Sequence, residues 1–219
     1  MDTLMGTIRF MSENADQLAE FTGEHLLMSA SAILFAMAIG IPVAILMTRN
    51  QTLAVAIQSV INTIQTIPSI SMLLVIMIFL GLGYSTAIAA LTLYSLLPIV
   101  QNTYAGLTNV DKNLIEAGTG MGMTPLQLLT KVKIPLALPV ILTGVRVAAV
   151  VAIGTATIAT FVGAGGLGEM IMRGIATTDD VKILAGAIPA VVIVIFVDLL
   201  MGRIEKKANY RMRASRAHK

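Results

Sequence analysis

The sequence predicts an all-α integral membrane protein with five transmembrane helices, an outside N-terminus and a cytoplasmic C-terminus. Hydrophobic residues make up 56% of its 219 residues and charged residues only 12%, whereas soluble domains carry about 25% charged residues. Several long stretches contain no charge, and the basic residues are spread unevenly over the segments between them. Such stretches are helical in lipid, because the strands of membrane barrels alternate apolar and polar residues and are about half as long.

Residues 1–25 differ from the rest of the chain, because they hold five acidic residues and a single Lys or Arg, Arg9. A secretory signal peptide has a basic start that an apolar run follows closely, and this segment lacks both features. We expect an extracytoplasmic polar leader that forms a short amphipathic helix or lies on the membrane surface.

The transmembrane domain is predicted over residues 26–203. Its first span, 26–47, is uncharged and would be roughly 33 Å long at about 1.5 Å per residue, which is enough to cross the hydrocarbon core. The second span, 57–81, has a polar first half and is expected to bend near Pro68. The other three spans are predicted at 85–107, 139–162 and 183–202.

The basic residues predict the orientation of these spans. With an outside N-terminus, eleven of the 15 basic residues fall on inner segments and three on outer segments, while Arg146 falls within a span. Basic residues favour cytoplasmic loops, so this distribution favours an outside N-terminus, an odd number of spans and a cytoplasmic C-terminus. Residues 204–219 are interpreted as a basic cytoplasmic tail that lies near anionic lipid.

The inner segment between spans three and four, residues 109–138, is long, because most connectors between helices have about 2 to 8 residues. We expect a first helix capped by Asn113, a glycine-rich turn, and a second short helix with Thr124 as its N-cap and Pro125 at its first position. Pro135 is expected to end this second helix before the fourth span begins.

Two charged residues fall inside predicted spans, Arg146 in the fourth and Asp198 in the fifth. Both would lie roughly 8 to 10 Å from the inner ends of their spans, at about 1.5 Å per residue. Intramembrane charges usually pair or face a cavity, so Arg146 and Asp198 are a candidate intramembrane pair. In the alternative interpretation, Arg146 reaches the interface and Asp198 faces a water-filled vestibule.

The stretch FVGAGGLGEM, residues 161–170, contains the G-x-G-x-x-G spacing of dinucleotide-binding sites. That spacing binds a pyrophosphate only after a strand and at the start of a helix. Here it follows a predicted transmembrane helix on the outer side, where nucleotide is not available. We therefore interpret it as a structural glycine loop of irregular backbone. Its glycines are Gly163, Gly165, Gly166 and Gly168.

The inner segment resembles the cytoplasmic signature of permease subunits of ATP-binding-cassette (ABC) importers, E-A-A-x3-G-x9-I-x-L-P. The match has no gaps, although Gly118 replaces Ala, Val132 replaces Ile and Ile134 replaces Leu. The layout of five spans with this loop between spans three and four also resembles that fold, over nearly the whole chain after residue 25. The matching positions are Glu116, Ala117, Gly118, Gly122, Val132, Ile134 and Pro135.

Three stretches resemble the osmoprotectant branch of that family most closely: QTIPSI, EAGTGMGMTP and FVGAGGLGEM. The sister branch of D-methionine permeases has a similar loop and a similar GAGGLG. The resemblance implies a multi-pass permease subunit in a bacterial plasma membrane, which forms the translocation pathway for glycine betaine, carnitine or choline. The alternative solute is an amino acid such as methionine.

The resemblance also implies partners and a mechanism. A short cytoplasmic helix would dock in a groove of a separate ABC ATPase, with Glu116 near a helix N-terminus or a basic residue of that partner. Gly118 and Gly122 would allow the backbone to approach the partner closely. The permease would form a homodimer or heterodimer with a second permease, and it would receive solute from an extracytoplasmic binding protein.

Enzymes and other function classes are not favoured by the sequence. It has no G-x-x-x-x-G-K-[ST] phosphate loop and no catalytic constellation, so ATP and Mg are expected on the partner ATPase and no cofactor on this chain. No ring of intramembrane acids points to an ATP-independent channel or exporter, and nothing points to a nucleic-acid partner. The chain has no Cys, and His25 and His218 are interpreted as solvated surface residues, so no metal site is predicted.

Residues that bind the solute are not identified by the sequence. The four tyrosines are not clustered into an aromatic cage of the kind that holds quaternary ammonium groups. We therefore expect solute selection to reside in the separate binding protein.

Overall fold

The computed structural model describes residues 2–217, with the side chains of residues 3–210. All secondary structure in this range is helical, and a π-helical segment, Leu129–Lys133, and a 3₁₀ turn, Ala159–Val162, flank α8. The α-helices are α1 (Asp2–Glu13), α2 (Ala15–Met47), α3 (Gln51–Thr66), α4 (Ser69–Leu80), α5 (Tyr84–Thr108), α6 (Lys112–Gly120), α7 (Pro125–Leu128), α8 (Ile134–Ala156), α9 (Leu167–Thr177) and α10 (Asp180–Ala217).

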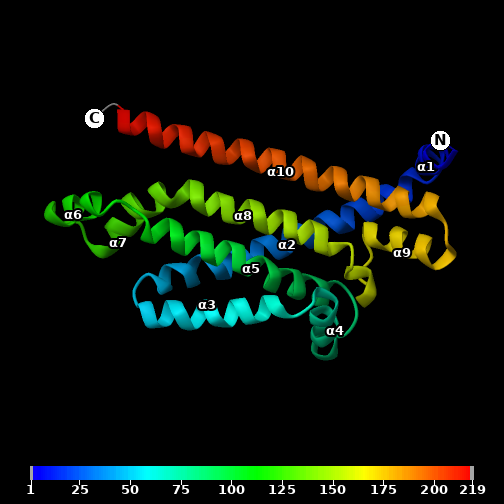
Figure 1. Cartoon of the computed structure of the whole chain (residues 1–219), viewed down its shortest axis with the longest axis horizontal. Coiled ribbons are helices and arrows are strands. Elements are labelled where there is room, and N and C mark those ends of the chain that lie inside the picture. The colour runs from blue at the N-terminus through cyan, green and yellow to red at the C-terminus, as the bar shows by residue number, and fades with distance from the viewer. Residues whose placement is uncertain (1, 218–219) are drawn as a thin grey trace.

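Four long helices form a bundle in which α5 packs between α2 and α8. Within the described residues, α2, α5, α8 (together with the short helical segments before it) and α10 are long and apolar enough to cross a membrane, and the bent pair α3–α4 makes a fifth candidate span. α5 packs against α2, α3, α4 and α8, whereas α10 lies along α8 and also contacts α1 and α9. Figure 1 shows α6, α7 and the C-terminus at one end of the bundle and α1, α4 and α9 at the other.

Small residues bring α5 and α8 into close contact at the centre of this bundle. A Cβ atom on Gly144 of α8 would lie 2.6 Å from the carbonyl oxygen of Pro98 in α5. A Cβ atom on Gly106 of α5 would lie 3.2 Å from the Cβ of Ala137 in α8. Membrane helices associate largely through such close packing, because lipid supplies no hydrophobic force between them.

The second predicted span is two helices rather than one. α3 and α4 meet at 101°, so α3 runs beside α5 while α4 turns across the end of the bundle (Figure 1). The predicted bend near Pro68 is confirmed, and its cause is local. Proline lacks an N–H group and drives the preceding residue out of the helical region, and Ile67 is extended with φ −74° and ψ 126°.

Two side-chain hydrogen bonds, one from α5 and one from α3, hold the break between α3 and α4 against α5. The Tyr94 hydroxyl donates a hydrogen bond to the carbonyl oxygen of Ile67. The Gln65 amide donates to the carbonyl oxygen of Tyr94 at 2.8 Å. The break is therefore anchored to the central helix at a point where its own helical hydrogen bonds are interrupted.

The first half of the predicted leader is a short helix, α1, which is one of its expected forms, but the second half differs from expectation. α2 begins at Ala15 rather than at residue 26, so the second half of the leader is continuous with the first span. Phe21 is buried against α9 and α10, while Asp16 and Glu20 are exposed. The helix therefore begins before the apolar run does. Its first part is an amphipathic segment that packs against neighbouring helices.

The interpretation of His25 as a solvated surface residue is wrong. Its side chain is fully buried, and its Nε2 lies 2.9 Å from the carbonyl oxygen of Ile153 in α8. His218 lies outside the described residues. The later helices also differ from the predicted spans, because α8 begins at Ile134 and α10 continues beyond residue 202.

Candidate functional site

The segment between α5 and α8 forms the end of the bundle that carries α6 and α7 (Figure 1). α6 begins at Lys112, and the carboxylate of Asp111 caps it by accepting a hydrogen bond from the N–H of Asn113 at 2.9 Å. The expected cap at Asn113 is therefore wrong by two residues. Asp111 precedes the first turn, where a carboxylate also interacts favourably with the helix dipole.

Gly118 lies at the contact between α6 and α7. It is buried, and a Cβ atom there would lie 2.7 Å from Leu128 Cδ1 and 3.3 Å from Met123 Sδ. The close contact that Gly118 makes in this structure is internal, and it sets how closely α6 packs on α7. Its approach to a partner protein stays a prediction.

The turn between the two short helices depends on Gly122 and Thr124. Gly122 has φ +79°, a left-handed conformation that side chains with a Cβ rarely adopt, and no atom lies within 4 Å of the position that a Cβ would take there. The Thr124 hydroxyl accepts from the N–H of Gln127 at 3.3 Å, and the Gln127 side chain accepts from the N–H of Thr124 at 2.9 Å. The predicted N-cap at Thr124 with Pro125 at the first helical position is confirmed.

The helix that starts at Pro125 does not end at Pro135. It passes through the π-helical segment Leu129–Lys133 and continues as α8. Proline inside a helix removes one hydrogen bond and its ring crowds the preceding turn, and a widened turn relieves this crowding. Ile134 and Pro135, from the signature, thus lie in one continuous helical path that joins α7 to a membrane-crossing helix.

Several side chains at this end are exposed although they are apolar. Met121 is 72% exposed and Leu126 is 69% exposed, and Leu114 on α6 is also exposed. Glu116 and Ala117 lie on the exposed surface of α6. Apolar side chains gathered on a surface mark a contact with another protein or a membrane.

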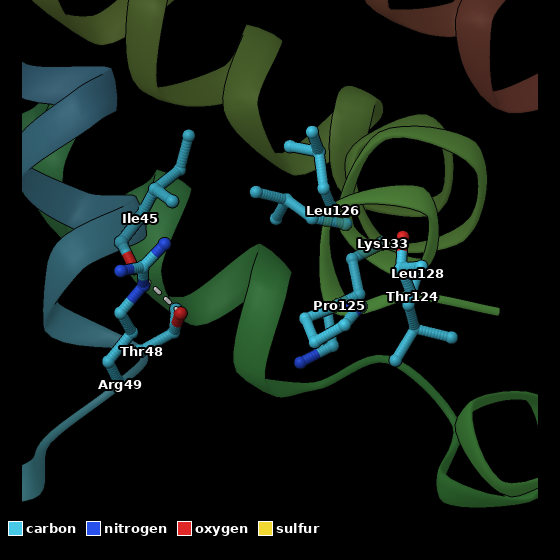
Figure 2. Close-up of a pocket in the computed structure, with 9 residues that line it drawn as sticks. Ile45, Thr48, Arg49, Thr124, Pro125, Leu126, Leu128 and Lys133 are labelled. Carbon is cyan, nitrogen blue, oxygen red and sulfur yellow. Dashed lines mark hydrogen bonds between the residues drawn. The ribbon is translucent and has the colours of Figure 1, made fainter. Parts of the chain in front are cut away.

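A pocket of about 450 Å³ lies beside α7 and opens toward the end of α2. Ile45, Thr48 and Arg49 line one side of it (Figure 2), and the other side is formed by residues from Thr124 to Lys133. Arg49 and Lys133 bring positive charge to this otherwise mostly apolar pocket, which sequence reasoning did not anticipate.

The glycine loop lies at the opposite end of the bundle. Gly163, Gly165 and Gly166 have φ values of +70°, +69° and +80°, so the backbone is irregular as predicted. The Glu24 carboxylate accepts a hydrogen bond from the N–H of Gly166 at 2.8 Å, and the Cβ of any side chain at Gly165 would collide with this carboxylate. The loop thus wraps around an acidic side chain from α2.

The fourth glycine of the loop has a packing role. A Cβ atom on Gly168 would collide with the carbonyl oxygen of Thr157, just beyond α8. The next residue, Glu169, accepts hydrogen bonds from Thr160 at 2.6 Å and from Arg173 at 3.1 Å. The motif therefore packs α9 tightly against the end of α8. The backbone N–H of Gly166 within it is bound by the Glu24 carboxylate of the same chain.

Arg146 and Asp198 lie together between α8 and α10. Arg146 donates from Nε to Asp198 Oδ1 at 2.6 Å and from Nη2 to Asp198 Oδ2 at 2.8 Å. Glu205 joins them, with its Oε2 3.4 Å from Arg146 Nη1. A Cβ atom on Gly202 would lie 3.1 Å from the same Nη1, so this glycine lets the guanidinium lie directly against α10.

Sequence reasoning missed Glu24, His25 and Glu205. Glu205 follows Asp198 by seven residues, which places both on one face of a helix, and this spacing was the available signal. No sequence signal joins Glu24 to the distant glycine loop. Among the described residues, no group of three or more His, Cys, Asp or Glu is arranged to hold a metal ion.

Comparisons with known proteins agree with this architecture. Residues 36–210 match the family described as "Binding-protein-dependent transport system inner membrane component". The chain is 48% identical over 210 residues to the carnitine transport permease protein OpuCD of Listeria monocytogenes, covering 95% of this chain and 94% of that protein. It is 46% identical over 207 residues to the glycine betaine/carnitine/choline transport system permease protein OpuCD of Bacillus subtilis, covering 94% of this chain and 90% of the relative.

A solved structure shows the same fold. A chain of the methionine ABC transporter MetNI, in an inward-facing conformation, matches with a TM-score of 0.77 and 26% sequence identity. The match covers 87% of this chain and 95% of that one. With the family match over most of its length and relatives of this similarity, the chain belongs to the binding-protein-dependent transport system inner membrane components, and it is a multi-pass protein of the plasma membrane.

Proposed function

We propose that the chain is the permease subunit of an ABC importer that moves a compatible solute such as glycine betaine, carnitine or choline. The observation that carries the proposal is the similarity along nearly the whole chain to permeases that are named for these solutes. The exposed signature loop supports it, since a permease of this kind needs a surface on which to receive an ATPase.

The proposed orientation places the α6–α7 end in the cytoplasm. Lys112, Lys131 and Lys133 belong to this end, and the basic end of α10 points to the same end of the bundle (Figure 1). Basic residues favour the cytoplasmic side. The glycine loop and α4 would then lie on the outer side, where an extracytoplasmic binding protein would deliver solute.

The loop geometry suggests how ATPase movement would reach the membrane. α6 presents Glu116 and Leu114 outward and rests on α7 through Gly118. α7 is continuous with α8 through the π-helical segment. A displacement of docked α6 would therefore be transmitted to a membrane-crossing helix along a stiff path, without a flexible linker in between.

The permease would work with other chains. ATP and Mg would be bound by the ATPase subunits and no cofactor by this chain, which has no phosphate loop. A second permease, identical or similar, would complete the pathway between the two subunits.

Substitutions in the loop test the coupling role. Replacing Glu116 by Lys reverses a charge on the docking surface, and replacing Gly122 by Val forces a β-branched residue into a left-handed conformation, at a cost of about 1–3 kcal/mol. Both variants should remain in the membrane but lose solute uptake and the stimulation of ATPase activity by loaded binding protein. The coupling role is wrong if this stimulation persists in both variants.

A second candidate solute is an amino acid such as methionine. The fold match to a methionine transporter, with 26% identity, is the observation that favours it. Uptake of labelled glycine betaine, carnitine, choline and methionine by the reconstituted importer separates the two. If the importer prefers methionine to all three osmoprotectants, the proposed solute is wrong but the permease role stands.

A further inference from the structure

α3 has its polar side turned away from the rest of the chain. Its buried positions are Ala54 and Ile61, which contact α5 and α2 in an apolar cluster. The opposite side carries Ser59, Asn62, Thr63 and Thr66, and all four are exposed. Their spacing of three and four residues places them on one helix face. A helix that met only lipid on this side would show apolar residues there.

The polar surface continues onto α5. Gln101 of α5 is exposed, and its amide donates a hydrogen bond to Asn62 Oδ1 of α3 at 3.2 Å. Asn62 lies roughly 16 Å along α3 from its first residue, at about 1.5 Å per residue, and therefore within the hydrocarbon layer if α3 crosses it. We call Ser59, Asn62, Thr63, Thr66 and Gln101 the polar stripe.

The two amides exclude lipid as the cover of the polar stripe. The hydroxyls could tolerate lipid, because Thr63 donates to the carbonyl oxygen of Ser59 at 2.8 Å and Thr66 to that of Thr63 at 2.7 Å. Each amide, however, has two N–H groups and an oxygen, and the one hydrogen bond between Asn62 and Gln101 leaves most of these groups free. Polar groups without partners in hydrocarbon are costly.

From this surface we infer that the polar stripe faces a water-filled passage between this chain and its second permease, and that Asn62 and Gln101 contact the solute as it passes. The inference rests on the proposed function for the presence of a second permease. The passage would be bounded by α3 and α5 of this chain on one side and by the corresponding helices of the partner permease on the other.

The chemistry of the polar stripe fits a small zwitterion or cation that must be released quickly. Amide N–H groups can donate to a solute carboxylate, and amide and hydroxyl oxygens can face a positively charged head. The stripe contains no ionised side chain, so it offers no strong counter-charge to hold the solute. Conduction requires binding that is weak enough to permit release.

Water access to single cysteines tests this inference, because the natural chain contains no Cys. Ser59→Cys, Thr63→Cys and Thr66→Cys each place one thiol on the polar stripe with little change in size. Val60→Cys is the matched control, because Val60 is 60% exposed on the same helix but lies outside the stripe. The assembled importer in membrane vesicles is treated with a charged, water-soluble thiol reagent, and remaining thiols are then tagged with a polymer that shifts the chain on a gel.

The stripe variants should be blocked by the charged reagent and lose the later gel shift, while Val60→Cys should keep it. Equal blocking of Val60→Cys, or no blocking of any stripe variant, would overturn the inference. Disulfides between two permeases at all three stripe positions, without reaction with the reagent, would show a dry protein contact and also overturn it.

The same vesicles separate this inference from the proposed function. Labelling reports water access and needs no knowledge of the solute. Failure of the Cys-free chain to import any osmoprotectant would contradict the proposed function even if the stripe reacts with the reagent. Asn62→Leu should reduce uptake, whereas Asn62→Gln, which keeps the amide, should retain more of it. If the Leu variant takes up solute as well as the natural chain does, Asn62 does not contact the solute.

Discussion

Arg146 is the residue whose surroundings most constrain how the last two membrane-crossing helices pack. One guanidinium from α8 meets two carboxylates of α10, Asp198 through two hydrogen bonds and Glu205 at a longer distance. An arginine fork matches a carboxylate in this paired geometry. All three side chains are half-buried, so the group joins α8 to α10 without being removed fully from water.

The composition of this group predicts an order of effects. Arg146→Met leaves two carboxylates near each other with no cation, whereas Asp198→Asn leaves Arg146 with Glu205. We therefore expect Arg146→Met to lower the amount of folded protein in the membrane more than Asp198→Asn does. Membrane levels and the thermal stability of the purified importer check this order, and equal losses would contradict it.

Exchanging the charges gives a sharper test of the same pair. Arg146→Asp combined with Asp198→Arg should recover part of the protein lost in either single variant, because a cation and a carboxylate again face each other. Recovery should be incomplete, since the new carboxylate at position 146 lies near Glu205. Adding Glu205→Gln should then improve it, and no recovery in either combination would count against pairing.

Single residues also show where the sequence was informative. The depth of Arg146 and Asp198 within two apolar runs was enough to propose that they meet. Glu205 was missed because it follows the end of the last apolar run, and the burial of His25 was missed because it lies where the acidic leader meets the first span. Burial of a polar side chain depends on which distant helix covers it, here α8 through Ile153, and local sequence does not carry that information.

At the scale of helices, the coupling segment is a small packed unit. α6 rests on α7 at Gly118, and α7 leads into α8 without a break. The position of α6 therefore depends on the close contact of Gly118 with Leu128 and on the left-handed turn at Gly122. This arrangement makes the contact testable by a paired substitution.

Gly118→Leu should push α6 away from α7, because even its Cβ would lie 2.7 Å from Leu128 Cδ1. We expect faster trypsin cleavage of the purified chain at Lys112 and Lys131, together with lower uptake. Leu128→Ala in the same chain should reverse both effects in part by making space. Gly120→Leu is the control for cleavage, since no atom lies within 4 Å of a Cβ at Gly120; faster cleavage there as well would contradict the packing argument.

Helix positions were easier to predict than helix ends. Long apolar runs, free of charge in α2 and α5 and interrupted by a single charge in α8 and α10, located these four helices, and Pro68 located the break between α3 and α4. The N-cap of α6 at Asp111 rather than at Asn113 was not predictable, because both side chains can cap a helix and lie two residues apart. The π-helical segment before Pro135 was missed because a proline can either end a helix or be accommodated inside it. Here Ile134 packs against Leu107 and Ala137, which favours a helix that continues through Pro135.

For the whole molecule, the bend between α3 and α4 sets the shape. α4 turns across the end of the bundle instead of continuing beside α5, so α3 is covered by α5 and α2 on one side and leaves its polar side open. A single copy of the chain therefore cannot enclose this surface. The sequence showed the polar first half of the second span, but it could not show which way that half would face.

The same architecture has a consequence for where the solute is selected. An aromatic cage needs several rings that face one space. Tyr94 is buried, and its hydroxyl is occupied by the carbonyl oxygen of Ile67 at the break between α3 and α4. Tyr210 lies on the exposed far end of α10, and Tyr84 lies at the opposite end of the bundle, at the start of α5. Tyr104 packs against the apolar cluster that joins α2, α3 and α5, so the four tyrosines do not face one common space.

The permease is therefore expected to bind its solute weakly when the binding protein is absent. Calorimetry with glycine betaine and carnitine, on the purified permease–ATPase complex alone, should detect no micromolar site, whereas the binding protein should supply one. Tyr94→Phe removes only a hydroxyl that holds the α3–α4 break, so it should change stability rather than affinity. Micromolar binding to the complex that disappears in Tyr94→Phe would place solute recognition inside the membrane, because a hydroxyl that only holds the break would not produce that loss.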